Sequence, residues 1–119
     1  MSYKNYKNTA QSMQRRKHFR LVYPPGYEPR LFIEGRQYYV IDLSEAGIRF
    51  DNPFLNRMPE DLVVAVIRLH HDKENIKIVG RVQRIQNSEI ALVLILGIPY
   101  SKILSEQLFL QNKRSLKAN

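Results

Sequence analysis

Short runs of alternating polar and apolar residues, separated by turn residues, occupy most of the chain between residues 21 and 98. Such runs predict β-strands, because successive side chains in a strand point to opposite faces. Glycine, proline or asparagine lies in most of the connections, as expected for tight turns. The pattern predicts an antiparallel all-β domain with strands near 21–23, 30–34, 38–44, 47–50, 62–69, 76–85 and 90–96.

The hydrophobic period changes after Pro99, a residue type that suits the first turn of a helix. The apolar residues that follow have the three- and four-residue spacing of an α-helix: Tyr100, Ile103, Leu104 and Leu108. We expect the helix to end near Asn112, and the last three of these side chains to cover one end of the strands. Strands of this number and length usually close into a barrel or sandwich, which removes exposed edges.

The net charge of +8 is concentrated at the two ends of the 119-residue chain. Residues 1–27 contain no acidic residue, and only cations follow Glu106 among the charged residues. A nearly neutral body with basic ends indicates a polyanionic partner. The chain length suits one domain. We therefore predict a flexible basic segment at 1–14, the domain at 15–113 and a basic tail at 114–119.

Several classes of protein do not fit the composition. No run approaches the ~18 apolar residues of a spanning helix, no signal peptide is recognisable, and cysteine is absent. The only histidine cluster, His70-His71-Asp72, lacks a second set of metal-binding residues, and no nucleophile and base are paired. We expect a cytoplasmic, non-catalytic protein with no membrane span, no metal site and no cofactor.

The segment 42–47, Asp-Leu-Ser-Glu-Ala-Gly, ends a predicted strand in a tight turn. Alternation places Asp42 and Ser44 on one face with Tyr38 and Val40, one pleat apart. A carboxylate beside a hydroxyl suits the N1–H and N2–H₂ edge of guanine. Gly47 follows where a Cβ atom would crowd the turn or a ligand.

Arginines are the second candidate binding group. Arg16 and Arg20 are four residues apart, and Arg15 precedes them directly. The planar arginine fork matches phosphate oxygens and the O6/N7 edge of guanine. In strand 76–85, alternation places Arg84 on the otherwise apolar face of Val82, where it either caps the rim of a barrel or stacks on a base.

Residues 16–20 and 42–47 together resemble the two signature motifs of the PilZ domain family, RxxxR and (D/N)xSxxG, at every fixed position. Arg15 matches the arginine that often precedes the first motif, and Gly80-Arg81-Val82 resembles a weaker family pattern. The resemblance extends over about residues 15–112. One departure is Ala91, at a position where glycine is frequent.

The resemblance implies a six-stranded antiparallel PilZ-type β-barrel with a C-terminal α-helix, and a receptor for the second messenger cyclic di-GMP. Arg16 and Arg20 would hold phosphates and guanine edges. Asp42 and Ser44 would bind guanine, and Gly47 would keep the turn open.

An arginine at the position of Arg15 implies binding of an intercalated cyclic di-GMP dimer. The ligand is expected to draw the N-terminal segment over the barrel and so create a surface for a downstream protein partner, which the sequence does not identify.

Two alternatives stay open. A small basic barrel could bind single-stranded nucleic acid, as OB-folds do, although the predicted strands lack a row of exposed aromatic residues. The chain could also be a PilZ-like adaptor that has no ligand.

Overall fold

The computed structural model describes residues 19–54, 58 and 62–118, with side chains as far as Lys113. The described elements are β1 (Leu21–Val22), β2 (Arg30–Ile33), β3 (Arg36–Leu43), β4 (Gly47–Asp51), β5 (Val63–Arg68), β6 (Asn75–Gln86), β7 (Glu89–Leu96) and α2 (Tyr100–Ala118). Every strand lies within two residues of its predicted bounds.

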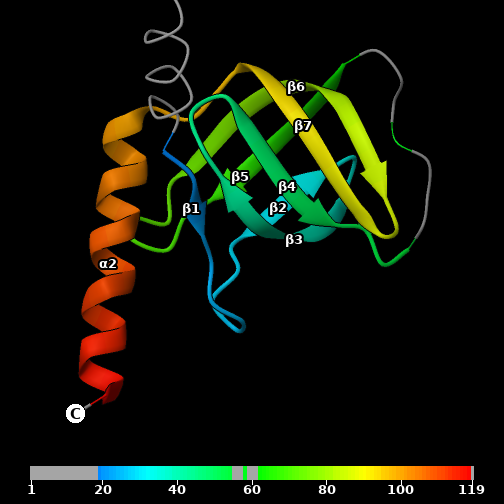
Figure 1. Ribbon diagram of the computed structural model, residues 1–119. Helices are drawn as coiled ribbons and strands as arrows, with labels where there is room; N and C mark the ends of the chain where they lie inside the picture. Colours follow the sequence, from blue (N-terminus) through cyan, green and yellow to red (C-terminus); the bar gives the residue numbers. More distant parts are fainter. Residues whose placement is uncertain (1–18, 55–57, 59–61, 119) are drawn as a thin grey trace, which may run out of the picture.

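The strands form a closed antiparallel β-barrel (Figure 1). Neighbours around the ring are β3, β2, β5, β6, β7 and β4, and β4 pairs with β3 to complete the ring. The short strand β1 also pairs with β3, beside the last residues of that strand. The predicted six-stranded antiparallel barrel with a C-terminal helix is confirmed.

Alternating side chains from every strand fill the interior of the barrel. Leu31, Val40, Phe50, Val63 and Ile78 are all completely buried. Their β-branched and aromatic shapes suit a pleated surface, and the hydrophobic effect of burying them closes the ring. The opposite faces of the strands are left for polar and charged groups.

The helix α2 packs beside the barrel, and its C-terminal end lies away from the strands (Figure 1). Ile103 and Leu110 are buried, with exposed fractions of 0% and 4%, whereas Leu104 and Leu108 are exposed. The prediction that Leu104 and Leu108 cover the barrel is therefore wrong. The predicted end near Asn112 is also wrong, because the helix continues to Ala118.

A β-bulge changes the faces of β3. Val40 pairs with Phe50, but Asp42 pairs with Arg49, so one extra residue lies between the two pairs. Val40 points into the core together with Phe50, and Asp42 points outward together with Arg49. The prediction that Asp42 shares a face with Tyr38 and Val40 is wrong, because alternation does not continue through a bulge.

The strand β6 contains a second bulge, between Val82 and Arg84. Val82 pairs with the buried Leu92, whereas Arg84 pairs with Ala91 on the outward face. Arg84 is therefore not on the apolar face of Val82, which corrects the second assignment made from alternation. The two bulges bring Asp42 and Arg84 to the same side of the barrel wall.

Candidate functional site

Four side chains from four strands lie in one row across the outer wall of the barrel. Asp42 on β3 pairs with Arg49 on β4, Arg49 pairs with Ala91 on β7, and Ala91 pairs with Arg84 on β6. Directly opposed residues in antiparallel strands are close neighbours. The small side chain of Ala91 lies between the two arginines, so the row is shallow at Ala91 and charged on either side of it.

The carboxylate of Asp42 is almost completely buried, with 1% of the residue exposed. Its Oδ1 accepts a hydrogen bond from Nη1 of Arg20 at 2.7 Å. Its Oδ2 accepts two hydrogen bonds from Arg49, from Nη2 at 2.7 Å and from Nε at 3.0 Å. Both oxygens therefore face guanidinium groups, which offset the cost of burying the charge.

Arg49 is held at both ends of its guanidinium group. Besides its two bonds to Asp42, its Nη1 donates to Oε1 of Glu89 at 2.9 Å. The hydrogen bonds that Arg49 donates to Asp42 and the charges of Asp42 and Glu89 raise the pKa of Arg49, although partial desolvation lowers it. The cation is thus firmly kept at this position of the wall.

The turn after β3 supplies the floor next to Asp42. The backbone N–H of Ser44 donates to the carbonyl of Gly47 at 2.8 Å, and Oγ of Ser44 accepts from the N–H of Ala46 at 3.3 Å. A Cβ atom on Gly47 would lie 3.3 Å from the carbonyl oxygen of Leu92. Ser44 shapes the turn, and Gly47 permits its close approach to β7.

An open pocket of ≈ 520 Å³ lies over this wall. Sites for small molecules commonly have volumes of about 300–1,000 Å³. The residues that line the pocket come from the segment before β1, from β3 and the turn after it, and from β4, β6 and β7: Arg20, Asp42, Ser44, Ala46, Gly47, Ile48, Arg49, Gln83, Arg84, Ala91, Leu92 and Val93.

Five of the residues selected from the sequence line this one pocket: Arg20, Asp42, Ser44, Gly47 and Arg84. Arg15 and Arg16, together with the predicted flexible segment 1–14, lie outside the described residues, so their proposed roles stay predictions.

Arg49 is a pocket residue that the sequence analysis did not select. It lies two positions after Gly47 in a strand whose Ile48 and Phe50 are buried. Alternation therefore placed its side chain on the same outward face as the turn. The pattern could have identified Arg49, but its contact with Asp42 depends on the bulge in β3.

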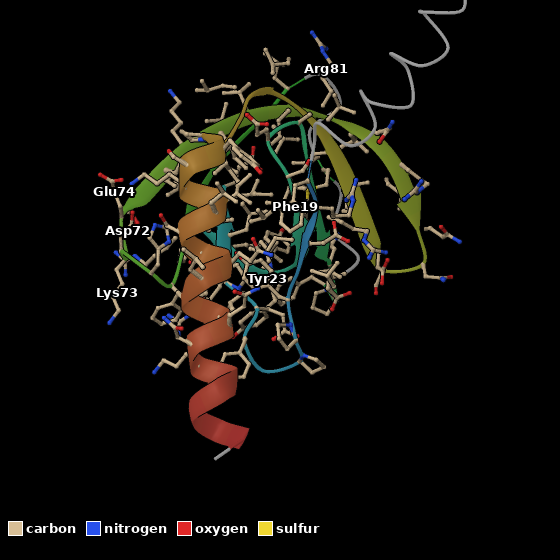
Figure 2. The ribbon with its side chains drawn as sticks, turned by 60° about the vertical axis from the view of Figure 1, so that its left-hand side comes forward. Phe19, Tyr23, Asp72, Lys73, Glu74 and Arg81 are labelled. Carbon is tan, nitrogen blue, oxygen red and sulfur yellow. The ribbon has the colours of Figure 1, made fainter. Side chains whose placement is uncertain are left out.

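A second group of polar side chains joins α2 to the barrel. Glu106, which is completely buried, accepts a hydrogen bond from the hydroxyl of Tyr23 at 3.0 Å and from the backbone N–H groups of His70 at 3.1 Å and His71 at 2.9 Å. Nδ1 of His71 also lies 2.9 Å from Oε1 of Glu106. Tyr23 directly follows β1, and Figure 2 shows it near the helix.

This arrangement explains the histidine pair noted in the sequence. His70 and His71 begin the loop between β5 and β6, and they face the helix carboxylate. Farther along the loop, Asp72 and Glu74 project beside the helix (Figure 2), where both accept hydrogen bonds from Lys102. Among the residues that the structure describes, no group of three or more potential ligands is arranged to hold a metal ion.

None of the described helices is long and apolar enough to cross a membrane.

The fold and the pocket define a small β-barrel protein with a candidate site for an anionic ligand. The family model of the PilZ domain matches residues 14–109, which is most of the chain. The protein therefore belongs to the PilZ domain family.

Solved structures share the same fold. An uncharacterised Legionella protein is 18% identical, with a TM-score of 0.50, and the match covers 86% of this chain and 100% of that chain. The Bacillus subtilis inhibitor of motility, MotI/DgrA, is 18% identical, with a TM-score of 0.52 and the same coverage of this chain. The match spans only 52% of MotI/DgrA.

A third structure is the PilZ domain of CeSA from a cellulose-synthesizing bacterium, with 16% identity and a TM-score of 0.45 over 81% of this chain and 98% of that domain. A comparison with curated proteins finds no match.

Proposed function

We propose that this protein is a receptor for cyclic di-GMP and acts through binding rather than catalysis. The observation that carries the proposal is the buried carboxylate of Asp42, which lies at an open pocket between arginine side chains. Guanine offers two adjacent donors to a carboxylate, and its O6 and N7 atoms accept bidentate bonds from arginine. The pocket therefore combines groups for the base with cations for the phosphates.

The charges near the pocket support a dianionic ligand. Arg20, Arg49 and Arg84 line it, while Asp42 and the neighbouring Glu89 neutralise part of their charge. The described residues therefore leave a net positive site. Arg15 and Arg16 precede Arg20 closely in the sequence and would add further cations, in agreement with their predicted role in the family motif.

The proposed mechanism begins with Arg20. Its side chain is 55% exposed and makes one hydrogen bond to Asp42. On binding, Arg20 leaves Asp42 and donates to a ligand phosphate or to a guanine edge. The guanine donors then bind Asp42 in its place. The N-terminal arginine segment then becomes ordered over the barrel, and the new surface signals to a partner protein.

Calorimetric titration with cyclic di-GMP tests the proposal, with GTP and cyclic di-AMP as controls. Saturable binding of cyclic di-GMP alone is expected, and its stoichiometry separates a single ligand from an intercalated pair. Preference for a single-stranded oligonucleotide, with affinity falling steeply as salt rises, would contradict the proposal. No binding of either would identify an adaptor without a ligand.

The first variant to test is Arg20→Ala. We expect it to weaken binding of cyclic di-GMP by about tenfold or more, because a bidentate arginine–guanine contact contributes about 1–3 kcal/mol. The control is Arg30→Ala, which removes an exposed arginine from β2, a strand that does not line the pocket. Equal affinities of the Arg20 variant and the wild type for cyclic di-GMP would show that Arg20 is not part of the binding site.

A further inference from the structure

The two arginines that hold Asp42 are attached to the protein very differently. Arg49 lies within the barrel wall, directly opposite Asp42 in the ladder between β3 and β4. Arg20 precedes β1, a strand of only two residues. The side chain of Arg49 is 33% exposed, compared with 55% for that of Arg20.

The number of contacts differs in the same direction. Arg49 makes two hydrogen bonds to Asp42 and a third to Glu89 on β7. Among the residues that the structure describes, Arg20 contacts only the other oxygen of Asp42. Removing Arg49 from Asp42 would break two hydrogen bonds, while the third, to Glu89, still holds Arg49 on a strand that is paired on both sides. Arg20 can leave by rotating one exposed side chain.

We propose that Arg49 is a positioning residue for guanine recognition: it stays on Asp42 when the ligand displaces Arg20. This inference rests on the proposed function and adds to it a residue that lies outside the two sequence motifs. Arg49 holds the carboxylate of Asp42 in place and directs its Oδ1 into the pocket, where that oxygen accepts from the base. Glu89 in turn holds Arg49.

The geometry leaves one oxygen of Asp42 available to accept hydrogen bonds from guanine. Both hydrogen bonds from Arg49 end on Oδ2, and the single bond from Arg20 ends on Oδ1. Within the described part of the chain, departure of Arg20 therefore leaves Oδ1 without a donor, while Oδ2 keeps its contacts with Arg49. A carboxylate oxygen that faces a base in this way discriminates guanine, which has donors on that edge, from adenine, whose N1 is an acceptor there.

The decisive variant is Arg49→Gln, measured beside the wild type by calorimetry with cyclic di-GMP. We expect about tenfold weaker binding, because Asp42 loses two charge-assisted hydrogen bonds and its orientation. Arg30→Gln is the matched control, since it removes the same charge from a strand outside the pocket and should leave affinity unchanged. Glu89→Gln, which retains Arg49 but loosens it, should give a smaller loss.

Nuclear magnetic resonance of the arginine Nε–H groups provides a second test on the unmodified protein. During titration with cyclic di-GMP, the Nε–H signal of Arg49 should stay protected from exchange, while the signal of Arg20 should shift. Tighter or unchanged binding by Arg49→Gln, or loss of the Arg49 signal, would overturn the inference about Arg49 and leave the proposed function standing. Absence of binding by the wild type would overturn the proposed function and the inference together.

Discussion

Two carboxylates are buried in the part of the chain that the structure describes, and their hydrogen-bond donors are of different kinds. Asp42 is held by the side chains of two arginines, at the edge of an open pocket. Glu106 is held by backbone N–H groups, a tyrosine hydroxyl and a histidine ring, between α2 and the barrel. Exposed fractions of 1% and 0% show that the degree of burial is not what distinguishes them.

The difference lies in what happens to the donors when the carboxylate is released. A guanidinium group that is partly exposed can turn to water or to a ligand, so its contact with Asp42 is exchangeable. The backbone N–H groups of His70 and His71 are fixed in the chain and belong to partly buried residues, so they cannot turn away, and leaving one of them unpaired costs about 1–3 kcal/mol. The hydrogen-bond partners of Asp42 can thus be exchanged, whereas those of Glu106 keep the helix in place.

Exchange of carboxylate for carboxamide at both positions tests this comparison directly, and Glu106→Gln should have the larger effect. The new NH₂ group faces donors, so at least one backbone N–H of His70 or His71 loses its acceptor. We expect the free energy of unfolding to fall by about 3 kcal/mol, measured by urea denaturation. Wild-type stability in this variant would mean that the contacts of Glu106 do not fasten the helix.

The hydroxyl of Tyr23 gives a smaller effect with a distinctive pH dependence. Burial, and then the charge and hydrogen bond of Glu106, raise the pKa of Tyr23 far above its usual value. Tyr23→Phe should cost about 1.5–3 kcal/mol near neutral pH, the usual contribution of a hydrogen bond to a charged group.

The sign of the pH dependence follows from proton binding. Above about pH 10 the unfolded chain releases the tyrosine proton and the folded protein keeps it, so the wild type loses about 1.4 kcal/mol of stability per pH unit through this residue. The variant lacks the group, so the stability difference between the two proteins should shrink from about pH 10 upward. Urea denaturation of both proteins across that range measures it, and a constant difference would contradict the role of Tyr23.

The smallest loss of stability is expected for Asp42→Asn. The two arginines are 55% and 33% exposed and can be rehydrated, so the variant leaves no buried cation without a partner. The free energy of unfolding should therefore change by only about 1 kcal/mol. Affinity for cyclic di-GMP should nevertheless fall by about tenfold, because a charge-assisted bond to guanine is lost. A large loss of stability with unchanged affinity would reverse the comparison.

Much of the fold follows from local patterns in the sequence. Alternation and turn residues located all the strands, and the change of period after Pro99 located the start of α2. The motif residues Asp42, Ser44 and Gly47 are close in sequence, so a tight turn was enough to bring their chemistry together. Arg20 and Arg84, which were selected from the sequence as candidate binding residues, also line the pocket.

The errors have a common cause. Alternation assigned Asp42 and Arg84 to the wrong faces, because each lies just after a bulge. A bulge depends on how two strands pair, so the sequence of one strand alone does not predict it. The helix prediction failed for a similar reason. Ile103, Glu106 and Leu110 face the barrel instead of Leu104 and Leu108, because the hydrogen-bond donors of Glu106 come from distant parts of the chain.

The sequence by itself determined the described strands, the start of the helix, the charge of the protein and the residue types of the candidate site. Only the tertiary structure decided that Arg49 would hold Asp42 and that Tyr23, 83 residues away, would meet Glu106. The physical reason is that local periodicity depends on neighbouring residues, whereas a buried charge is stabilised by whichever donors the closed barrel brings to it.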